Sequence, residues 1–95
     1  MTPLFVNMVR YLLIITGRVQ GVGFRYGAYH QAISMGLNGY VRNLRDGSVE
    51  IEIEGEETSV ERFILWVKTG PPHARVVSTV IEKLSPKYQD GFIIK

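Results

Sequence analysis

The chain has 95 residues, of which 45% are hydrophobic, and this suits a single domain with one core. It contains no cysteine, which excludes disulfides and thiolate metal sites and agrees with a reducing, cytoplasmic location. Its net charge is only +2 and its basic residues are scattered, so we expect small anions rather than nucleic acid as ligands.

Residues 1–8 lack the basic start and the cleavage site of a secretory signal, and we interpret them as an N-terminal extension of a single domain over residues 9–95. The first strand of that domain is predicted from Val9 to Thr16. The apolar run within it, from Tyr11 to Ile15, is far too short to span a bilayer. We therefore expect a buried strand and no membrane association.

A glycine-rich segment, Gly17 to Arg25, follows the first strand. Glycine at positions 17, 21 and 23 tolerates unusual backbone angles, so successive N–H groups can converge on one anion. A helix that begins near Phe24 adds the positive end of its dipole, and the Arg25 guanidinium can hold two phosphate oxygens. The segment predicts an oxyanion site, with a flexible glycine turn as the alternative.

The segment does not fit the common phosphate-binding motifs. A nucleotide P-loop ends in Gly-Lys-Ser or Gly-Lys-Thr, whereas this chain has Gly23-Phe24-Arg25. A dinucleotide-binding motif needs glycine where this chain has Tyr26, and the chain is too short for a doubly wound sheet. A thiol phosphatase needs a cysteine nucleophile, which is absent. We therefore expect no nucleotide, nicotinamide or flavin cofactor.

A helix and a β-hairpin are predicted after the glycine-rich segment. The helix runs from Phe24 to Met35 along an apolar stripe, and Gly36 ends it. The strands of the hairpin cover residues 37–44 and 48–54. They are joined at Asp46-Gly47, a strong hairpin-turn signal, because both residues tolerate the positive φ of such turns.

Asn43 lies at the end of the first hairpin strand. Its carboxamide can donate and accept hydrogen bonds at once, which suits it to hold a water molecule in a fixed orientation. The alternative is that the side chain satisfies backbone groups at the turn. Its position alone does not decide between these two roles.

The second hairpin strand alternates apolar residues with Glu50, Glu52 and Glu54. Alternating charges of this kind are typical of the solvated face of a strand, so we assign them no chemistry. They also argue against an RNA-recognition domain, because outward carboxylates repel a phosphate backbone and offer no aromatic surface for bases.

The C-terminal part of the chain predicts a helix and two strands. The helix covers residues 58–69, with Thr58 and Glu61 as a capping box. A fourth strand is predicted over residues 76–84 and a short edge strand over residues 92–94. The order βαββαβ predicts an α+β, ferredoxin-like α/β sandwich, with two helices on one face of an antiparallel sheet.

The loop and the hairpin, in this order, resemble the acylphosphatase family from about Arg10 to the C-terminus. The resemblance rests on four segments, which cover residues 17–25, 39–43, 46–50 and 70–76. It implies that Arg25 binds the phosphate of a substrate and that Asn43 positions the attacking water. The family more often has tryptophan at the position of Tyr40, a conservative change that we do not expect to alter the chemistry.

The resemblance implies a hydrolase that cleaves acyl phosphates to a carboxylate and inorganic phosphate by direct attack of water. The phosphoryl group would be held by the loop residues Val19, Gln20, Gly21, Val22, Gly23, Phe24 and Arg25. The expected partners are a small acyl phosphate as substrate and inorganic phosphate as product or inhibitor. We expect a monomer, and the short length favours the free enzyme over the similar segment of larger hydrogenase-maturation proteins.

Neither His30 nor His73 has a second ligand at metal-binding spacing, so we expect a metal-independent protein. A functional alternative remains open at this point. The same fold serves small regulatory domains, and the chain could be a non-catalytic domain that binds a small anion.

Overall fold

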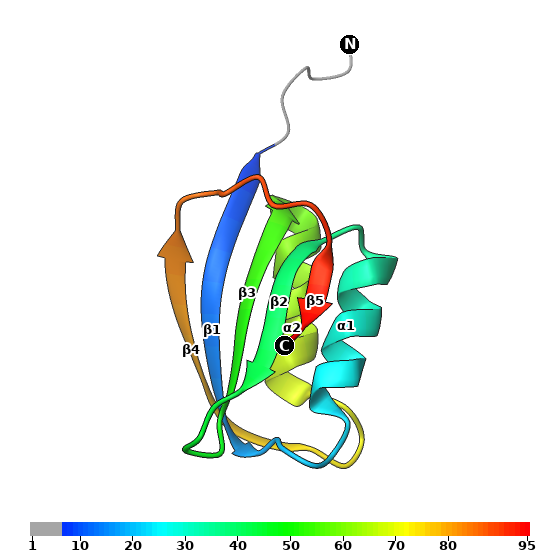
Figure 1. The fold of residues 1–95 in the computed structure, drawn as a ribbon, viewed down its shortest axis with the longest axis vertical. Helices are drawn as coiled ribbons and strands as arrows, with labels where there is room; N and C mark the ends of the chain where they lie inside the picture. The colour runs from blue at the N-terminus through cyan, green and yellow to red at the C-terminus, as the bar shows by residue number, and fades with distance from the viewer. Residues whose placement is uncertain (1–6) are drawn as a thin grey trace.

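Residues 7–95 are the part of the chain that the computed structural model describes, and they form five strands and two helices (Figure 1). In chain order the elements are β1 (Met8–Arg18), α1 (Phe24–Ser34), β2 (Asn38–Asn43), β3 (Val49–Glu56), α2 (Glu57–Thr69), β4 (Arg75–Leu84) and β5 (Phe92–Ile94). Residues 1–6 of the expected extension lie outside the described residues. Met8, which we also assigned to that extension, is the first residue of β1 and pairs with Glu56.

The strands form one sheet in the order β4-β1-β3-β2-β5. The first four strands pair antiparallel, and β5 runs parallel to β2 at the opposite edge from β4. Both helices cover the same face, with α1 against β2 and β5 and with α2 against β1, β3 and β4 (Figure 1). This confirms the ferredoxin-like prediction, except that the edge strand makes the sheet mixed rather than wholly antiparallel.

The core lies between the sheet and the helices. Every second residue of the strands and every third or fourth residue of the helices contributes to it, because residues at this spacing lie on one face of the element. The buried members with no exposed surface include Leu13, Ile15, Val41, Val49, Ile51, Ile53, Ala28, Ala32, Val60, Phe63 and Val67. Since α1 begins directly at the buried Phe24, this packing fixes where the glycine-rich segment meets the helix.

The prediction of a solvated glutamate face is wrong for Glu54, which has no exposed surface. Its carboxylate binds the Arg10 guanidinium at 3.1 Å and accepts the backbone N–H groups of Lys87 and Gln89. These two residues belong to the connection from β4 to β5, which crosses the end of the sheet (Figure 1). The ion pair therefore anchors the crossover that brings β5 beside β2.

The predicted capping box of the second helix is also wrong. The helix begins at Glu57, directly after β3, and its N-cap is Glu56, whose carboxylate accepts from the N–H groups of Thr58 and Ser59. These hydrogen bonds hold the pKa of Glu56 below its usual value. The capping box fails because the strand continues two residues further than the alternating pattern indicated.

Candidate active site

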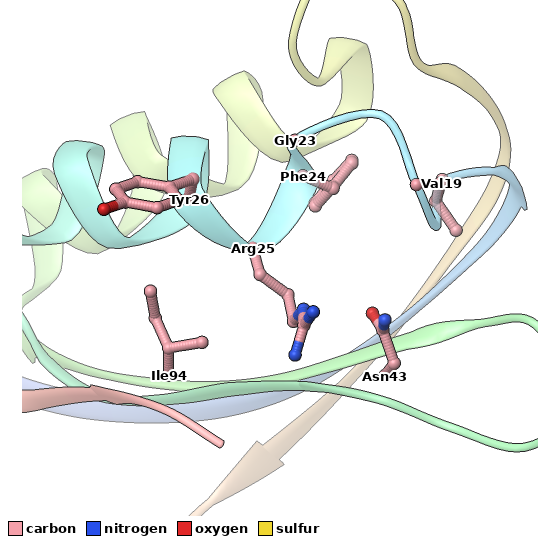
Figure 2. Close-up of a pocket in the computed structure, with 8 residues that line it drawn as sticks. Val19, Gly23, Phe24, Arg25, Tyr26, Asn43 and Ile94 are labelled. Atoms are coloured by element: carbon pink, nitrogen blue, oxygen red, sulfur yellow. The ribbon is translucent and has the colours of Figure 1, made fainter.

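A cavity of about 280 Å³ opens where the start of α1 faces the ends of β2 and β5 (Figure 2). It is lined by Val19, Gly21, Gly23, Phe24, Arg25, Tyr26, Asn43 and Ile94. The structure thus brings the glycine-rich segment and Asn43 to one place. Of the residues expected in the site, Gln20 and Val22 do not line the cavity, and Tyr26 and Ile94 line it without having been predicted.

Gly21, Gly23 and the first residues of α1 form one wall of the cavity. Gly21 and Gly23 have φ of 74° and 80°, in the left-handed region that favours glycine. In the described part of the chain, no backbone N–H of residues 20–26 donates to a protein acceptor. The first turn of α1 also carries no acidic side chain. This combination of open donors and a helix N-terminus is what an anion requires.

Gln20 supports the loop through its side chain. Its Nε2 atom donates to the carbonyl oxygens of Leu44 at 2.7 Å and Ser48 at 2.9 Å, both in the turn between β2 and β3. Leu44 directly follows Asn43 in the chain. The two hydrogen bonds therefore tie the loop to the strand end that carries Asn43.

The hairpin turn that presents Asn43 has its own hydrogen bonds. The Leu44 N–H donates to the carbonyl of Ser48, and the Ser48 N–H donates to the Asp46 carboxylate at 2.9 Å. The Ser48 hydroxyl and N–H together lower the pKa of Asp46. Gly47 has φ of 95°, so the expected turn forms at Asp46-Gly47.

The Arg25 side chain extends from the first turn of α1 into the cavity, and Figure 2 shows its guanidinium beside the carboxamide of Asn43. One of its nitrogens donates to the backbone oxygen of Lys95 at 3.1 Å. Within residues 7–95, no Asp or Glu side chain forms an ion pair with Arg25. Its other N–H donors are therefore available to a ligand.

Tyr26 and Ile94 had no signal in the sequence that marked them as site residues. Tyr26 lies next to Arg25 but off the buried stripe of α1, and it is 66% exposed. Ile94 belongs to the short strand β5, far from the loop in the sequence, and only the parallel pairing of β5 with β2 brings it to the cavity.

Tyr40 lies on the opposite face of the sheet and does not line the cavity. Its hydroxyl donates to Glu50 at 2.7 Å and to Glu52 at 2.9 Å, and burial together with these carboxylates raises its pKa. The Lys95 ammonium lies 3.8 Å from the centre of its ring.

No group of three or more metal-ligating side chains occurs among the described residues. No helix among residues 7–95 is long and apolar enough to cross a membrane.

Comparisons with known proteins agree on one family. The family model for acylphosphatase matches residues 11–94. An acylphosphatase of Trichormus variabilis is 44% identical over 89 residues, which cover 94% of this chain and 88% of that protein. An acylphosphatase of Thermococcus kodakarensis is 48% identical over 84 residues, which cover 88% of this chain and 92% of that protein.

A solved structure gives the same result. The crystal structure of acylphosphatase from Bacillus subtilis matches with a TM-score of 0.89 and 39% identity, over 92% of this chain and 98% of that chain. The chain belongs to the acylphosphatase family of enzymes.

Proposed function

We propose that the chain hydrolyses the bond between carboxyl oxygen and phosphorus in acyl phosphates, and that the cavity between the loop and Asn43 is its active site. One observation carries the proposal. The open N–H donors of the loop, the Arg25 guanidinium and the Asn43 carboxamide meet in one cavity. Family membership supports the same activity.

The loop and Arg25 would bind the phosphoryl group. An acyl phosphate already carries a good leaving group, so catalysis consists mainly of positioning the phosphoryl group and neutralising the charge on its oxygens. The backbone N–H groups of residues 19–25 and the guanidinium supply the positive partners. The hydrogen bond from Arg25 to Lys95 holds the side chain in the cavity and leaves its remaining donors for phosphate oxygens.

Asn43 would hold the water that attacks phosphorus. The bond from the water oxygen to phosphorus forms as the bond from phosphorus to the carboxyl oxygen breaks, and the carboxylate leaves with the electron pair. The proton of the water passes to a phosphate oxygen, so the enzyme needs no titrating base. We expect no covalent intermediate, and the reaction as proposed uses no metal or cofactor.

An assay with two substrates and a chelator tests the proposal. The purified chain is incubated with benzoyl phosphate and, separately, with a phosphate monoester. Rapid release of phosphate from benzoyl phosphate alone is the expected result. Binding of inorganic phosphate without turnover would instead indicate a non-catalytic domain that binds small anions. Gel filtration tests the accompanying proposal that the chain, as one domain, acts as a monomer.

A further inference from the structure

The cavity has an apolar end that the hydrolysis of the phosphoryl group does not explain. Tyr26 and Ile94 line this end, from α1 and β5. Figure 2 shows both of them on the side of the Arg25 guanidinium that faces away from Asn43. Tyr26 is 66% exposed and Ile94 is 37% exposed, so neither side chain serves mainly to fill the core.

The geometry of the proposed reaction decides which part of a substrate lies at that end. In phosphoryl transfer the attacking and leaving oxygens lie roughly in line on opposite sides of phosphorus. If Asn43 holds the water and Arg25 the phosphoryl group, the acyl group leaves on the side away from Asn43. Tyr26 and Ile94 lie on that side.

We infer that Tyr26 and Ile94 form the acyl subsite, and that the enzyme prefers acyl phosphates with an apolar, ring-sized acyl group. This inference rests on the proposed function. The polar side chains that line the cavity, apart from the Tyr26 hydroxyl, are Arg25 and Asn43, and both are assigned to the phosphoryl group and the water. Apolar contact is therefore the means of recognition left for the acyl group.

The size of the whole cavity and the packing of Tyr26 agree with this preference. The cavity volume of about 280 Å³ is near the lower end of the range for small-molecule sites, roughly 300 to 1,000 Å³. The Tyr26 ring stacks on His30 with 5.3 Å between ring centres and 22° between ring planes. An aromatic ring at the mouth of a small cavity favours a planar partner.

The test compares kcat/KM for benzoyl phosphate and acetyl phosphate in the parent enzyme and in Tyr26→Ala and Ile94→Ala. The ratio of benzoyl to acetyl efficiency should fall by about 10-fold in each variant, the low end for apolar contacts because both side chains are partly exposed. The intrinsic reactivity of the two substrates cancels when each variant is compared with the parent. Inhibition by inorganic phosphate, which has no acyl group, should keep its parental constant.

Matched controls separate a subsite from a general effect on the fold. Ile93→Ala removes the same side chain from the neighbouring position of β5, which pairs with Tyr40 and does not line the cavity. Tyr88→Ala removes an exposed tyrosine that also lies outside the cavity lining. Both should keep the parental ratio. Tyr26→Phe keeps the ring and should keep the ratio as well.

Three outcomes would overturn the inference. Equal losses for both substrates in Tyr26→Ala and Ile94→Ala would remove the acyl subsite while the hydrolase activity stands. A changed ratio in Ile93→Ala would have the same consequence, because the effect would then not be local to the cavity. Failure of the parent enzyme to hydrolyse either substrate would instead refute the proposed function, and the acyl subsite with it.

Discussion

The two faces of the sheet use charged groups in opposite ways. On the face without helices, Arg10 is 1% exposed and binds Glu52 and Glu54, and Arg42 binds Glu50 at 2.7 Å. At the cavity, Arg25 has a backbone oxygen as its partner and forms no ion pair with an acidic side chain of the described residues. Paired charges of the first kind hold segments together, whereas an arginine with free N–H donors beside open backbone N–H groups suits ligand binding.

The largest effect is expected for Arg25→Ala. The substitution removes a charge-assisted interaction worth about 1.5 to 3 kcal/mol in binding, and more where charge develops in the transition state. Turnover of benzoyl phosphate should fall below detection and inhibition by phosphate should weaken. The thermal midpoint should change little. Full activity in this variant would refute the assignment of Arg25.

Arg10→Met tests the paired arginine on the face of the sheet without helices. It leaves Glu54 buried without its cationic partner, and breaking a buried pair in this way costs about 3 to 5 kcal/mol. Urea titration should show this loss in the free energy of unfolding. If the variant keeps parental stability, the buried ion pair does not anchor the crossover. Arg62→Met, on the exposed side of α2, is a control for the loss of one arginine charge.

Asn43→Ala separates water placement from phosphate binding. We expect turnover to fall by about 10²-fold, because the variant cannot orient the attacking water. Inhibition by inorganic phosphate should remain close to the parental value. A loss of phosphate affinity as large as the loss of turnover would show that Asn43 binds the anion itself.

Gln20→Ala tests whether the loop must be tied to the hairpin. Each lost hydrogen bond contributes about 0.5 to 1.5 kcal/mol, and the loop should then shift relative to Asn43. We expect kcat to fall by about 10-fold, with a smaller change in phosphate inhibition. Gln31→Ala, which removes a glutamine from the second half of α1, is the matched control. Equal values of kcat in both variants would exclude a positioning role for Gln20.

The smallest effect is a dependence of stability on pH from the pair formed by Arg42 and Glu50. The hydrogen bond from Arg42 holds the pKa of Glu50 below its ordinary value of 4.5. A carboxylate whose pKa is lowered in the folded state stabilises the fold at pH values above its ordinary pKa. This contribution is lost as the pH falls through the lowered pKa. Arg42→Ala should therefore lower the thermal midpoint slightly at neutral pH. The difference from the parent should shrink at low pH, and an unchanged difference would contradict the pairing.

Much of this architecture was predictable because the signals are local. The alternation in β3, the apolar stripe of α1 and the glycines of the loop each depend on a few neighbouring residues. The same holds for the turn at Asp46-Gly47, which forms as expected with Gly47 at positive φ. Asn43 could be named as a candidate because the turn placed it at a strand end and the family resemblance pointed to it.

The errors share a different physical origin. Glu54 looked like an exposed strand residue, since no local pattern shows that the connection between β4 and β5 crosses over it. The N-cap of α2 was misplaced because pairing of Met8 with Glu56 keeps β3 extended to its last residue. In both cases contact with a segment distant in the sequence decided the environment of the residue.

The sequence alone determined the order of elements, the position of the glycine-rich loop and the chemical type of each donor, because backbone preference and hydrophobic periodicity act over a few residues. Tertiary structure decided which of these groups meet. It paired β5 with β2 and so carried Ile94 and the backbone oxygen of Lys95 to Arg25, and it placed Arg25 at the cavity while enclosing Arg10. Such contacts depend on long-range packing, which residue-by-residue patterns do not encode.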